Sequence, residues 1–390
     1  MDERELLNRI TKLISGTGVS VTELFKYYDI RNLLIKVASH DIPYDLQKRS
    51  IEMIVRLYYT ARQGGYSTEF EIVYRYIDWI IKIPWGVFTK DQVDLKQIEE
   101  TLNKSHYGLK KVKTKILTYI GALKMQWALQ QKNADNQGQS VQNQQVLSNI
   151  PVLLFVGLQG LGKTTIAKSI AKSLGRNFQK ISFAAFGDIL QLRGKPKSYP
   201  DAEPGIIVKA LINAKSMNPV LLLDELDKAS GKEGLRNDIY AALLEIFDPA
   251  QNTHFVDKYI DYPIDLSKIF FIATANTTGT LPSALLDRVE LVHFTSYSDE
   301  EKIVIGKNYI YPNVLKQVGL TAEQLKITDE AWPYIVRPMG FDAGIRQLNR
   351  VLMNVGRKVA YEILTNKVKS VTITPDNVKQ YLDVDMGYVN

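Results

Sequence analysis

The chain has 390 residues, more than the roughly 100–200 residues of an average domain, so two or three domains are expected. Hydrophobic residues make up 45% and charged residues 23%, which excludes a disordered or fibrous chain, and the absence of cysteine excludes disulfides, thiolate nucleophiles and Cys-bound zinc. A net charge of +7 permits binding to nucleic acid or to an acidic partner but does not by itself indicate either.

Residues 1–100 are expected to form a helical N-terminal region. Apolar residues recur at helical spacing over 6–14, 44–62 and 68–81, and glycines interrupt the first two runs. The charged N-terminus lacks the apolar core of a secretory signal, and no run approaches the roughly 18–20 apolar residues of a membrane span. A cytoplasmic protein without membrane contact is therefore expected.

Two further helices are expected over 94–131, separated by His106-Tyr107-Gly108. The composition then changes, because ten of the sixteen residues from 130 to 145 are Gln or Asn. Such a segment has too little apolar surface to offset its chain entropy. It predicts a mobile Gln/Asn-rich insert at about 130–147.

The segment 101–296 is expected to be an α/β nucleotide-binding domain. Apolar runs typical of strands occur at 152–156, 180–183, 220–224, 269–275 and 291–295, with helical stretches between them. This alternation predicts a parallel five-stranded sheet flanked by helices. Residues 297–390 return to a helical pattern, with one short strand expected near 370–373, and are expected to form a third domain.

One motif carries most of the chemical information. Residues 157–164 read Gly-Leu-Gln-Gly-Leu-Gly-Lys-Thr and fit G-x-x-x-x-G-K-[ST], after a predicted strand and before a predicted helix. The glycines allow backbone N–H groups to surround a phosphate chain, and the helix N-terminus adds partial positive charge. The expected nucleotide-binding residues of this segment are Gly157, Gly160, Leu161, Gly162, Lys163, Thr164 and Thr165.

Acidic and charge-sensing residues follow in the positions that ATP hydrolysis requires. Asp224 ends the apolar run at 220–224, about 60 residues beyond the phosphate loop, and Glu225 follows it directly. Thr164 and Asp224 are expected to hold Mg²⁺, and Glu225 is expected to polarise the attacking water. Asn276 is a candidate for ordering that water. Two further candidates, for charge stabilisation, are Arg288 and Arg346.

Longer stretches resemble the ATPase module of Lon proteases, within the AAA+ ATPases. The resemblance covers roughly residues 42–383 and depends on several motifs. These are Ile83-Pro84-Trp85, His106-Tyr107-Gly108, the run Ala241–Asn252, Asp265-Leu266-Ser267-Lys268, Thr274-Ala275-Asn276, Leu285-Leu286-Asp287-Arg288, Gly344-Ile345-Arg346 and Val371–Pro375.

The resemblance implies a role for each matching residue. His106 and Tyr107 would lie at the adenine, and Asn276 would be the residue called sensor 1. Arg288 would be an arginine finger that reaches the nucleotide of a neighbouring subunit, which implies a homo-oligomeric ring, usually a hexamer. Arg346 would be sensor 2 on a helical lid, and Tyr199 would be the pore aromatic that grips unfolded or misfolded protein. ATP and Mg²⁺ are the implied substrate and cofactor.

Three departures from the Lon pattern are visible. Leu158-Gln159 replace two prolines common in the phosphate loop, and Pro200-Asp201-Ala202 replace a small aliphatic residue and a glycine after the pore aromatic. No Ser–Lys peptidase dyad is expected, because the nearest look-alike, Pro282-Ser283-Ala284, lies inside the ATPase segment.

The leading hypothesis is therefore a Lon-like AAA+ ATPase that remodels, unfolds or translocates proteins without its own peptidase. A first alternative is the ATPase part of a truncated or split Lon protease that works with a separate peptidase. A second alternative is a nucleic-acid-dependent ATPase, prompted by the positive charge and by three basic residues before Tyr199 (Arg193, Lys195 and Lys197).

Overall fold

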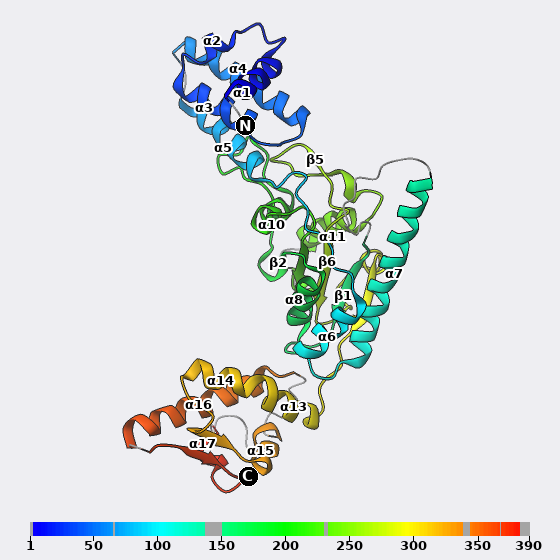
Figure 1. The fold of residues 1–390 in the computed structure, drawn as a ribbon, viewed down its shortest axis with the longest axis vertical. Coiled ribbons are helices and arrows are strands. Elements are labelled where there is room, and N and C mark those ends of the chain that lie inside the picture. The colour runs from blue at the N-terminus through cyan, green and yellow to red at the C-terminus, as the bar shows by residue number, and fades with distance from the viewer. Residues whose placement is uncertain are drawn as a thin grey trace.

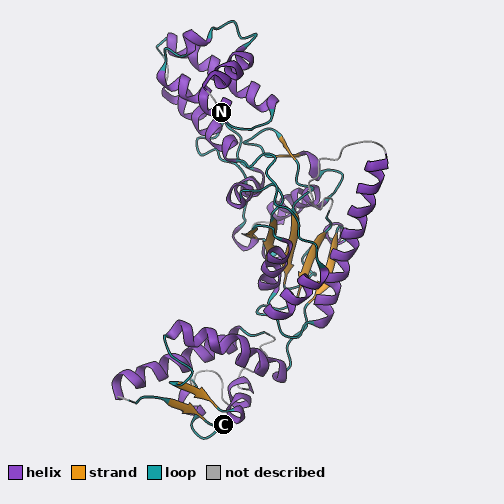
Figure 2. Ribbon diagram, in the orientation of Figure 1, coloured by secondary structure: helices purple, strands orange, loops and turns teal. Residues whose placement is uncertain are grey.

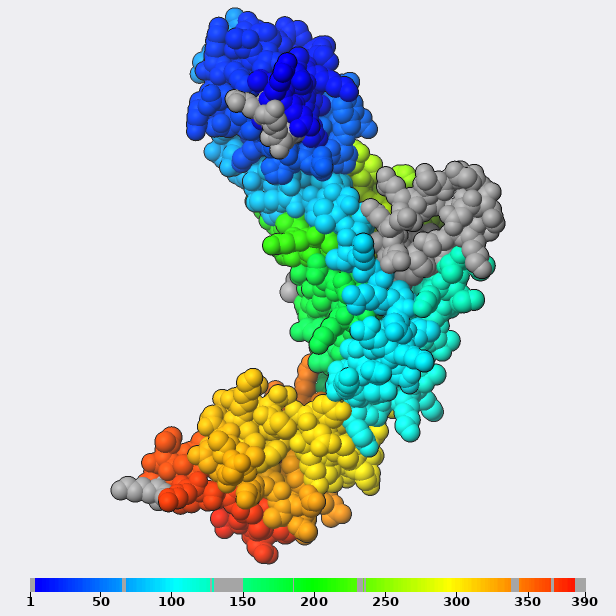
Figure 3. Space-filling view, viewed as in Figure 1, coloured from blue at the N-terminus to red at the C-terminus, as the bar shows by residue number. Residues whose placement is uncertain are grey.

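A computed structural model describes residues 3–64, 67–136, 150–229, 233–337, 344–366 and 368–382. Figures 1 and 3 show three regions that follow one another along the longest axis: N-terminal helices, an α/β region and a C-terminal, mostly helical region. The strands gather mainly in the middle region, with one short pair in the C-terminal region (Figure 2).

The N-terminal region consists of helices, as predicted. They are α1 (Glu3–Ile14), α2 (Val21–Leu24), α3 (Tyr28–Ser39), α4 (Tyr44–Arg62) and α5 (Ser67–Lys82). Their apolar faces form a shared core in which Ile10, Leu34, Ile54 and Ile77 are fully buried. None of the helices in the described ranges is long and apolar enough to cross a bilayer.

Helices α6 (Leu95–Ser105) and α7 (Lys110–Asn136) are separated at His106-Tyr107-Gly108, as predicted. The predicted Gln/Asn-rich insert does not begin at 130, because α7 continues through 136. Gln, Lys and Ala have favourable helix propensities, and extending an existing helix costs far less than starting one. The rest of the predicted insert, 137–147, lies outside the described residues.

The α/β region contains the predicted parallel five-stranded sheet. Its strands are β1 (Val152–Val156), β2 (Phe178–Ser182), β3 (Val220–Asp224), β6 (Phe270–Ala275) and β7 (Val289–His293), in the order β2-β3-β6-β1-β7. The central strands β1, β3 and β6 are buried along their whole length, which explains their continuous apolar sequences. β2 and β7 each begin two residues before the predicted start.

Helices flank this sheet and short elements connect it. The helices are α8 (Lys163–Leu174), α9 (Ile189–Arg193), α10 (Ile206–Ala214), α11 (Glu233–Phe247) and α12 (Ser283–Leu286). A small antiparallel hairpin joins β4 (Phe255–Val256) to β5 (Pro263–Ile264). Single 3-10 turns cover Phe183–Ala185, Leu226–Lys228 and Asn252–His254.

The C-terminal region is mainly helical, as predicted, but it contains one more strand than the sequence indicated. Its elements are α13 (Asp299–Ile305), a π-helical segment (Gly306–Ile310), α14 (Tyr311–Val318), β8 (Leu325–Ile327), a 3-10 turn (Asp329–Ala331), α15 (Trp332–Val336), α16 (Arg346–Asn366), β9 (Val371–Ile373) and α17 (Val378–Tyr381). The additional strand, β8, pairs in parallel with the predicted strand β9.

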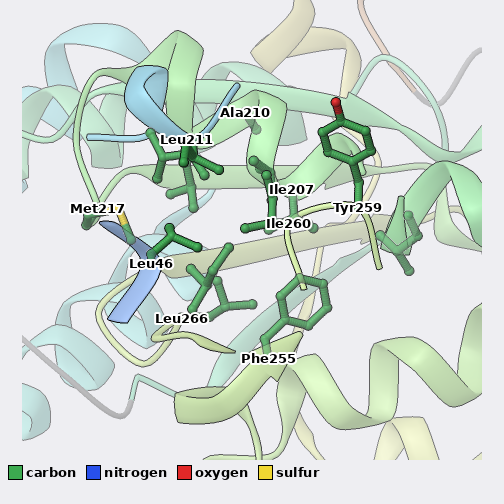
Figure 4. Close-up of a cluster of buried hydrophobic side chains, with 14 of the residues drawn as sticks. Leu46, Ile207, Ala210, Leu211, Met217, Phe255, Tyr259, Ile260 and Leu266 are labelled. Carbon is green, nitrogen blue, oxygen red and sulfur yellow. The ribbon is translucent and has the colours of Figure 1, made fainter. Parts of the chain in front are cut away.

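Two hydrophobic cores cover the opposite faces of the main sheet. Successive residues of β1 point to opposite faces, so Leu154 joins one core and Leu153 the other. The first core extends to the N-terminal helices and includes Leu46 of α4 together with Ile207 and Ile260, which are labelled in Figure 4. The second extends to the C-terminal region. Each core therefore continues from one face of the sheet into one of the outer regions.

Candidate active site

The phosphate loop lies between β1 and α8 and depends on glycine. Gly157, Gly160 and Gly162 have φ values of 155°, 83° and 90°, a region that L-residues with a side chain rarely adopt. A Cβ on Gly157 would also lie 2.7 Å from the carbonyl oxygen of Phe294. The loop therefore keeps its backbone N–H groups and the N-terminus of α8 near the space where a phosphate chain would bind.

A cavity of about 230 Å³ lies against this loop. The parallel register brings the carboxyl ends of β1, β3 and β6 to the same edge of the sheet, which is where this cavity opens. The predicted residues that line it are Gly160, Leu161, Gly162, Lys163, Thr164, Thr165, Asp224, Glu225, Asn276 and Arg346.

Lys163 is buried at the first turn of α8, and its ammonium group is held against the loop. The Nζ atom donates to the carbonyl oxygens of Gly157 and, at 3.1 Å, Leu158, and to Asn276 Oδ1 at 3.4 Å. Burial lowers the pKa of Lys163, while the carboxylates of Asp227 and Asp224 act in the opposite direction. The side chain is therefore already positioned at the mouth of the phosphate loop.

Thr274 joins the two acidic residues, and sequence reasoning assigned it no role. Its Oγ1 donates to Asp224 Oδ1 at 2.6 Å and accepts a 2.9 Å hydrogen bond from the backbone N–H of Glu225. Thr274 is 1% exposed, and Glu225 has a left-handed backbone with φ 60°. One feature of the sequence could have suggested this role. Thr274 is a hydroxyl residue within the apolar run 269–275, and this run forms the strand next to β3, which ends in Asp224.

The carboxylates themselves are paired with lysines. Asp224 Oδ2 lies 2.5 Å from Lys180 Nζ, and Glu225 Oε1 lies 2.8 Å from Lys228 Nζ. Within the described residues there is no group of three His, Cys, Asp or Glu side chains that would enclose a metal ion. The Thr164 hydroxyl and the Asp224 carboxylate nevertheless face one cavity, and Mg²⁺ commonly takes one or two protein oxygens and fills its other positions with phosphate and water.

Asn276 follows β6 and is held from both sides. Its backbone N–H donates to Asp227 Oδ2 at 3.1 Å, while its side-chain oxygen accepts from Lys163. The second oxygen of Asp227 is buried and has no hydrogen-bond partner among the residues that the structure describes. Asn276 is thus held by the lysine of the phosphate loop through its side chain and by the turn that follows Glu225 through its backbone.

The C-terminal region reaches the phosphate loop directly. Arg346, the first residue of α16, donates from Nη1 to Gln159 Oε1 at 2.8 Å, and the N–H of Ile345 donates to the carbonyl oxygen of Gly160 at 3.2 Å. A Cβ on Gly344 would lie 2.6 Å from the carbonyl oxygen of Gln159. Gln159, one of the departures noted above, therefore accepts a hydrogen bond from Arg346.

His106 and Tyr107 line a second cavity of about 910 Å³. His106 Nε2 is hydrogen-bonded to Thr165 Oγ1 at 2.8 Å, so this cavity begins beside the first turn of α8. Burial, followed by the nearby Lys113 ammonium, lowers the pKa of His106 to about 4, and the ring is therefore neutral at pH 7. Tyr107 remains 40% exposed.

Arg288 and Tyr199 line neither of these two cavities. Arg288 pairs with Asp248 at 3.0 Å. Tyr199 lies in the loop between α9 and α10 and is 49% exposed. The structure therefore separates these two predicted residues from the site of their own chain.

Two family models match the two segments of the chain that contribute residues to this cavity. The ATPase family associated with various cellular activities (AAA) matches residues 153–297, and the Lon protease AAA+ ATPase lid domain matches residues 316–371. The chain belongs to the Lon protease family. In Lon terms, Lys163, Glu225 and Asn276 lie in the AAA segment and Arg346 lies in the lid, so the cavity forms where the two meet.

Curated Lon proteases are similar over most of the chain. The Lon protease of Dictyoglomus thermophilum is 38% identical over 91% of this chain, Lon protease 2 of Thermus thermophilus 41% over 83%, and the Lon protease of Mycoplasma mycoides 36% over 97%. The matched parts make up 42%, 39% and 44% of those proteins. The chain thus spans about two fifths of the length of the curated relatives it matches.

Proposed function

We propose that this Lon-family chain binds and hydrolyses ATP with Mg²⁺ and uses the cycle to remodel, unfold or translocate proteins. One observation supports the proposal above all others. The phosphate loop, the Asp224–Glu225 pair, Asn276 and Arg346 come from four separate parts of the sequence and line one cavity. A nonfunctional Gly-rich turn would not require this convergence.

The roles follow from the positions of the atoms. Backbone N–H groups of the loop and the Lys163 ammonium stabilise negative charge on the β- and γ-phosphates. Thr164 and Asp224 supply oxygen ligands for Mg²⁺, which when bound offsets charge on the phosphate oxygens. Glu225 accepts a proton from the attacking water, and Asn276 orients that water. Arg346 detects the nucleotide from the lid because it already contacts Gln159 of the loop.

Completion of the site requires a second subunit under this proposal. Arg288 is exposed and lies outside the phosphate cavity of its own chain, so it stabilises the transition state only at a neighbour's nucleotide. A homo-oligomeric ring, most simply a hexamer, provides such a neighbour for every site.

The decisive experiment is steady-state ATP hydrolysis with and without an unfolded protein such as casein. Glu225→Gln is the matched control, because it keeps the side-chain volume and removes the proton acceptor. We expect wild-type turnover well above that of the variant and a further increase with casein. Equal turnover of the two proteins would refute ATP hydrolysis at this site, and turnover unaffected by casein would refute protein remodelling.

The similarity to Lon proteases favours a second candidate, the ATPase part of an ATP-dependent protease that acts with a separate peptidase. We propose that these 390 residues do not themselves cleave peptides. The Pro282-Ser283-Ala284 triplet lies at the start of α12, between Asn276 and Arg288. Release of peptides from casein by this chain with ATP would contradict the proposal.

A further inference from the structure

The predicted pore loop between α9 and α10, residues 194–205, has a closed base. The N–H of Lys195 donates to the carbonyl oxygen of Glu203 at 3.0 Å, which joins the two ends of the loop. Asp257 lies beneath this closure and is fully buried. Its carboxylate accepts from the N–H of Gly205 at 2.7 Å and from those of Tyr259 and Ile260 at 2.8 and 3.0 Å. The base of the loop is therefore fixed to the segment that follows β4.

Glycine is required at both ends of this loop. Gly194 has φ 81°, and a Cβ there would lie 2.6 Å from an Asp257 oxygen. A Cβ on Gly205 would overlap the carbonyl oxygen of Leu192 and the amide nitrogen of Gly194. The two ends of the loop thus approach each other so closely that its base has no room for side chains at these two positions.

The three basic residues that suggested nucleic-acid binding have partners inside the protein. Arg193 pairs with Glu245 of α11, and Lys195 pairs with Asp201 across the loop. The Lys197 ammonium lies 3.7 Å from the centre of the Tyr76 ring, which belongs to α5 of the N-terminal region. Their charges therefore contribute to the shape of the loop, and Asp201, a departure from the Lon pattern, is part of its internal closure.

Helix α5 contacts both the loop and its base, and Figure 1 shows this helix where the N-terminal helices meet the α/β region. Arg75 Nη1 donates to the carbonyl oxygen of Pro200 at 3.4 Å. Tyr76 is fully buried, and its hydroxyl donates to the carbonyl oxygen of Ile260 at 3.0 Å. Ile260 also donates its N–H to Asp257. One turn of α5 therefore contacts both the loop itself and the segment beneath its base.

Tyr199 itself stands out at the tip of this fixed loop. Two turns flank it: its N–H donates to the carbonyl oxygen of Pro196 at 3.0 Å, and its own carbonyl oxygen accepts from Ala202 at 3.1 Å. A side chain that pulls on a polypeptide must be mounted on a stiff support, because a compliant loop would yield under load. The contacts to α5 supply such a support from outside the ATPase core.

We propose that α5 anchors the Tyr199 loop, with Lys197 and Tyr76 as positioning residues that couple the N-terminal helices to the grip on substrate. The inference rests on the proposed function, since it assumes that Tyr199 contacts unfolded protein. Neither residue touches the nucleotide cavity, so the effect of each is on substrate engagement.

The test compares wild type, Lys197→Met, Lys197→Arg and Tyr199→Ala in the full chain. The measured quantity is the casein concentration that gives half-maximal stimulation of ATP turnover. Methionine keeps the length and apolar stem of lysine but has no charge to place over the ring, so we expect this concentration to rise by about fivefold to tenfold. Arginine also packs over aromatic rings, and we expect Lys197→Arg to remain within about twofold of wild type.

A double-mutant cycle that combines Lys197→Met with Tyr76→Leu tests whether the Tyr76 ring is the partner of Lys197. Tyr76→Phe retains the ring and should retain the Lys197 effect, whereas adding Lys197→Met to Tyr76→Leu should produce little further change. A Lys197→Met protein that responds to casein like wild type, while Tyr199→Ala has lost the response, would overturn the anchor and leave the proposed function intact. A full casein response in Tyr199→Ala would instead overturn substrate gripping by Tyr199, and the anchor with it.

Discussion

Arg288 donates a 3.0 Å hydrogen bond from Nη2 to Asp248 Oδ2 within its own chain. Asp248 is itself held by the N–H of Ala250 at 3.0 Å and by the side chain of Gln251 at 3.1 Å. The hydrogen bond from Ala250, followed by the one from Arg288, keeps the pKa of Asp248 below its usual value. The predicted arginine finger is therefore held in one orientation while it remains partly exposed.

Replacement of Arg288 by alanine is expected to reduce ATP turnover by about 10³-fold or more, because the transition-state charge loses its cationic partner. Nucleotide affinity should change little, since Arg288 does not line the cavity of its own chain. Mixing experiments test the action in trans. An Arg288→Ala subunit retains its Glu225, and a Glu225→Gln subunit retains its Arg288, so mixed rings should recover activity. Mixtures as inactive as their components would contradict the trans role.

Thr274→Val should lower kcat for ATP hydrolysis by about tenfold to a hundredfold while leaving nucleotide affinity nearly unchanged. Valine has the same shape as threonine but leaves Asp224 Oδ1 and the Glu225 N–H without their shared partner, and unpaired buried groups are costly. Thr274→Ser is the matched control, because it keeps the hydroxyl group. If valine and serine gave the same kcat, the bridging hydroxyl would have no part in placing Glu225.

His106 predicts a pH dependence of stability. Its pKa is lowered from 6.5 to about 4 in the folded chain, so between these values the unfolded state binds a proton that the folded state does not. This contribution is fully present above pH 6.5 and is lost as the pH falls toward 4, with a total of about 3 kcal/mol. Urea denaturation of wild type and His106→Gln at pH 7 and pH 5 checks it. The variant should lose less stability between the two pH values, and an equal loss would contradict the assignment.

The ion pair between Asp91 and Arg176 should be important for stability. The two side chains are 2% and 0% exposed and form two hydrogen bonds of 2.6 Å, and Arg176 also donates to the carbonyl oxygen of Lys268 at 2.7 Å. Asp91→Asn removes the charge that compensates the buried guanidinium, and we expect a loss of about 3–5 kcal/mol in the free energy of unfolding. Asp91→Leu combined with Arg176→Met should cost less than Asp91→Leu alone. Equal urea midpoints for wild type and Asp91→Asn would refute the prediction.

Much of the central α/β region was predictable because the sequence features that indicate its strands and its phosphate loop each lie within one short segment. The runs 152–156 and 220–224 are strands with the expected limits, since a strand buried on both faces must be apolar throughout. The phosphate loop was recognisable because its glycines adopt positive φ within one short segment. The helical continuation of α7 through Asn136 was missed because a polar composition does not exclude a helix.

Other features arise from residues far apart in the sequence. Thr274 acquires its role only when β6 lies beside β3, and Lys197 only when α5 packs against the Tyr199 loop. A periodic pattern in the sequence cannot predict such a contact, because each of these contacts depends on how separate elements pack together. The sequence by itself determined the sheet, the phosphate loop and the chemical types of the site residues, since these follow from local backbone geometry and side-chain chemistry. Only the tertiary structure decided which side chains meet, because a cavity between β1, β3, β6 and α16 exists only after hydrophobic burial has brought those elements together.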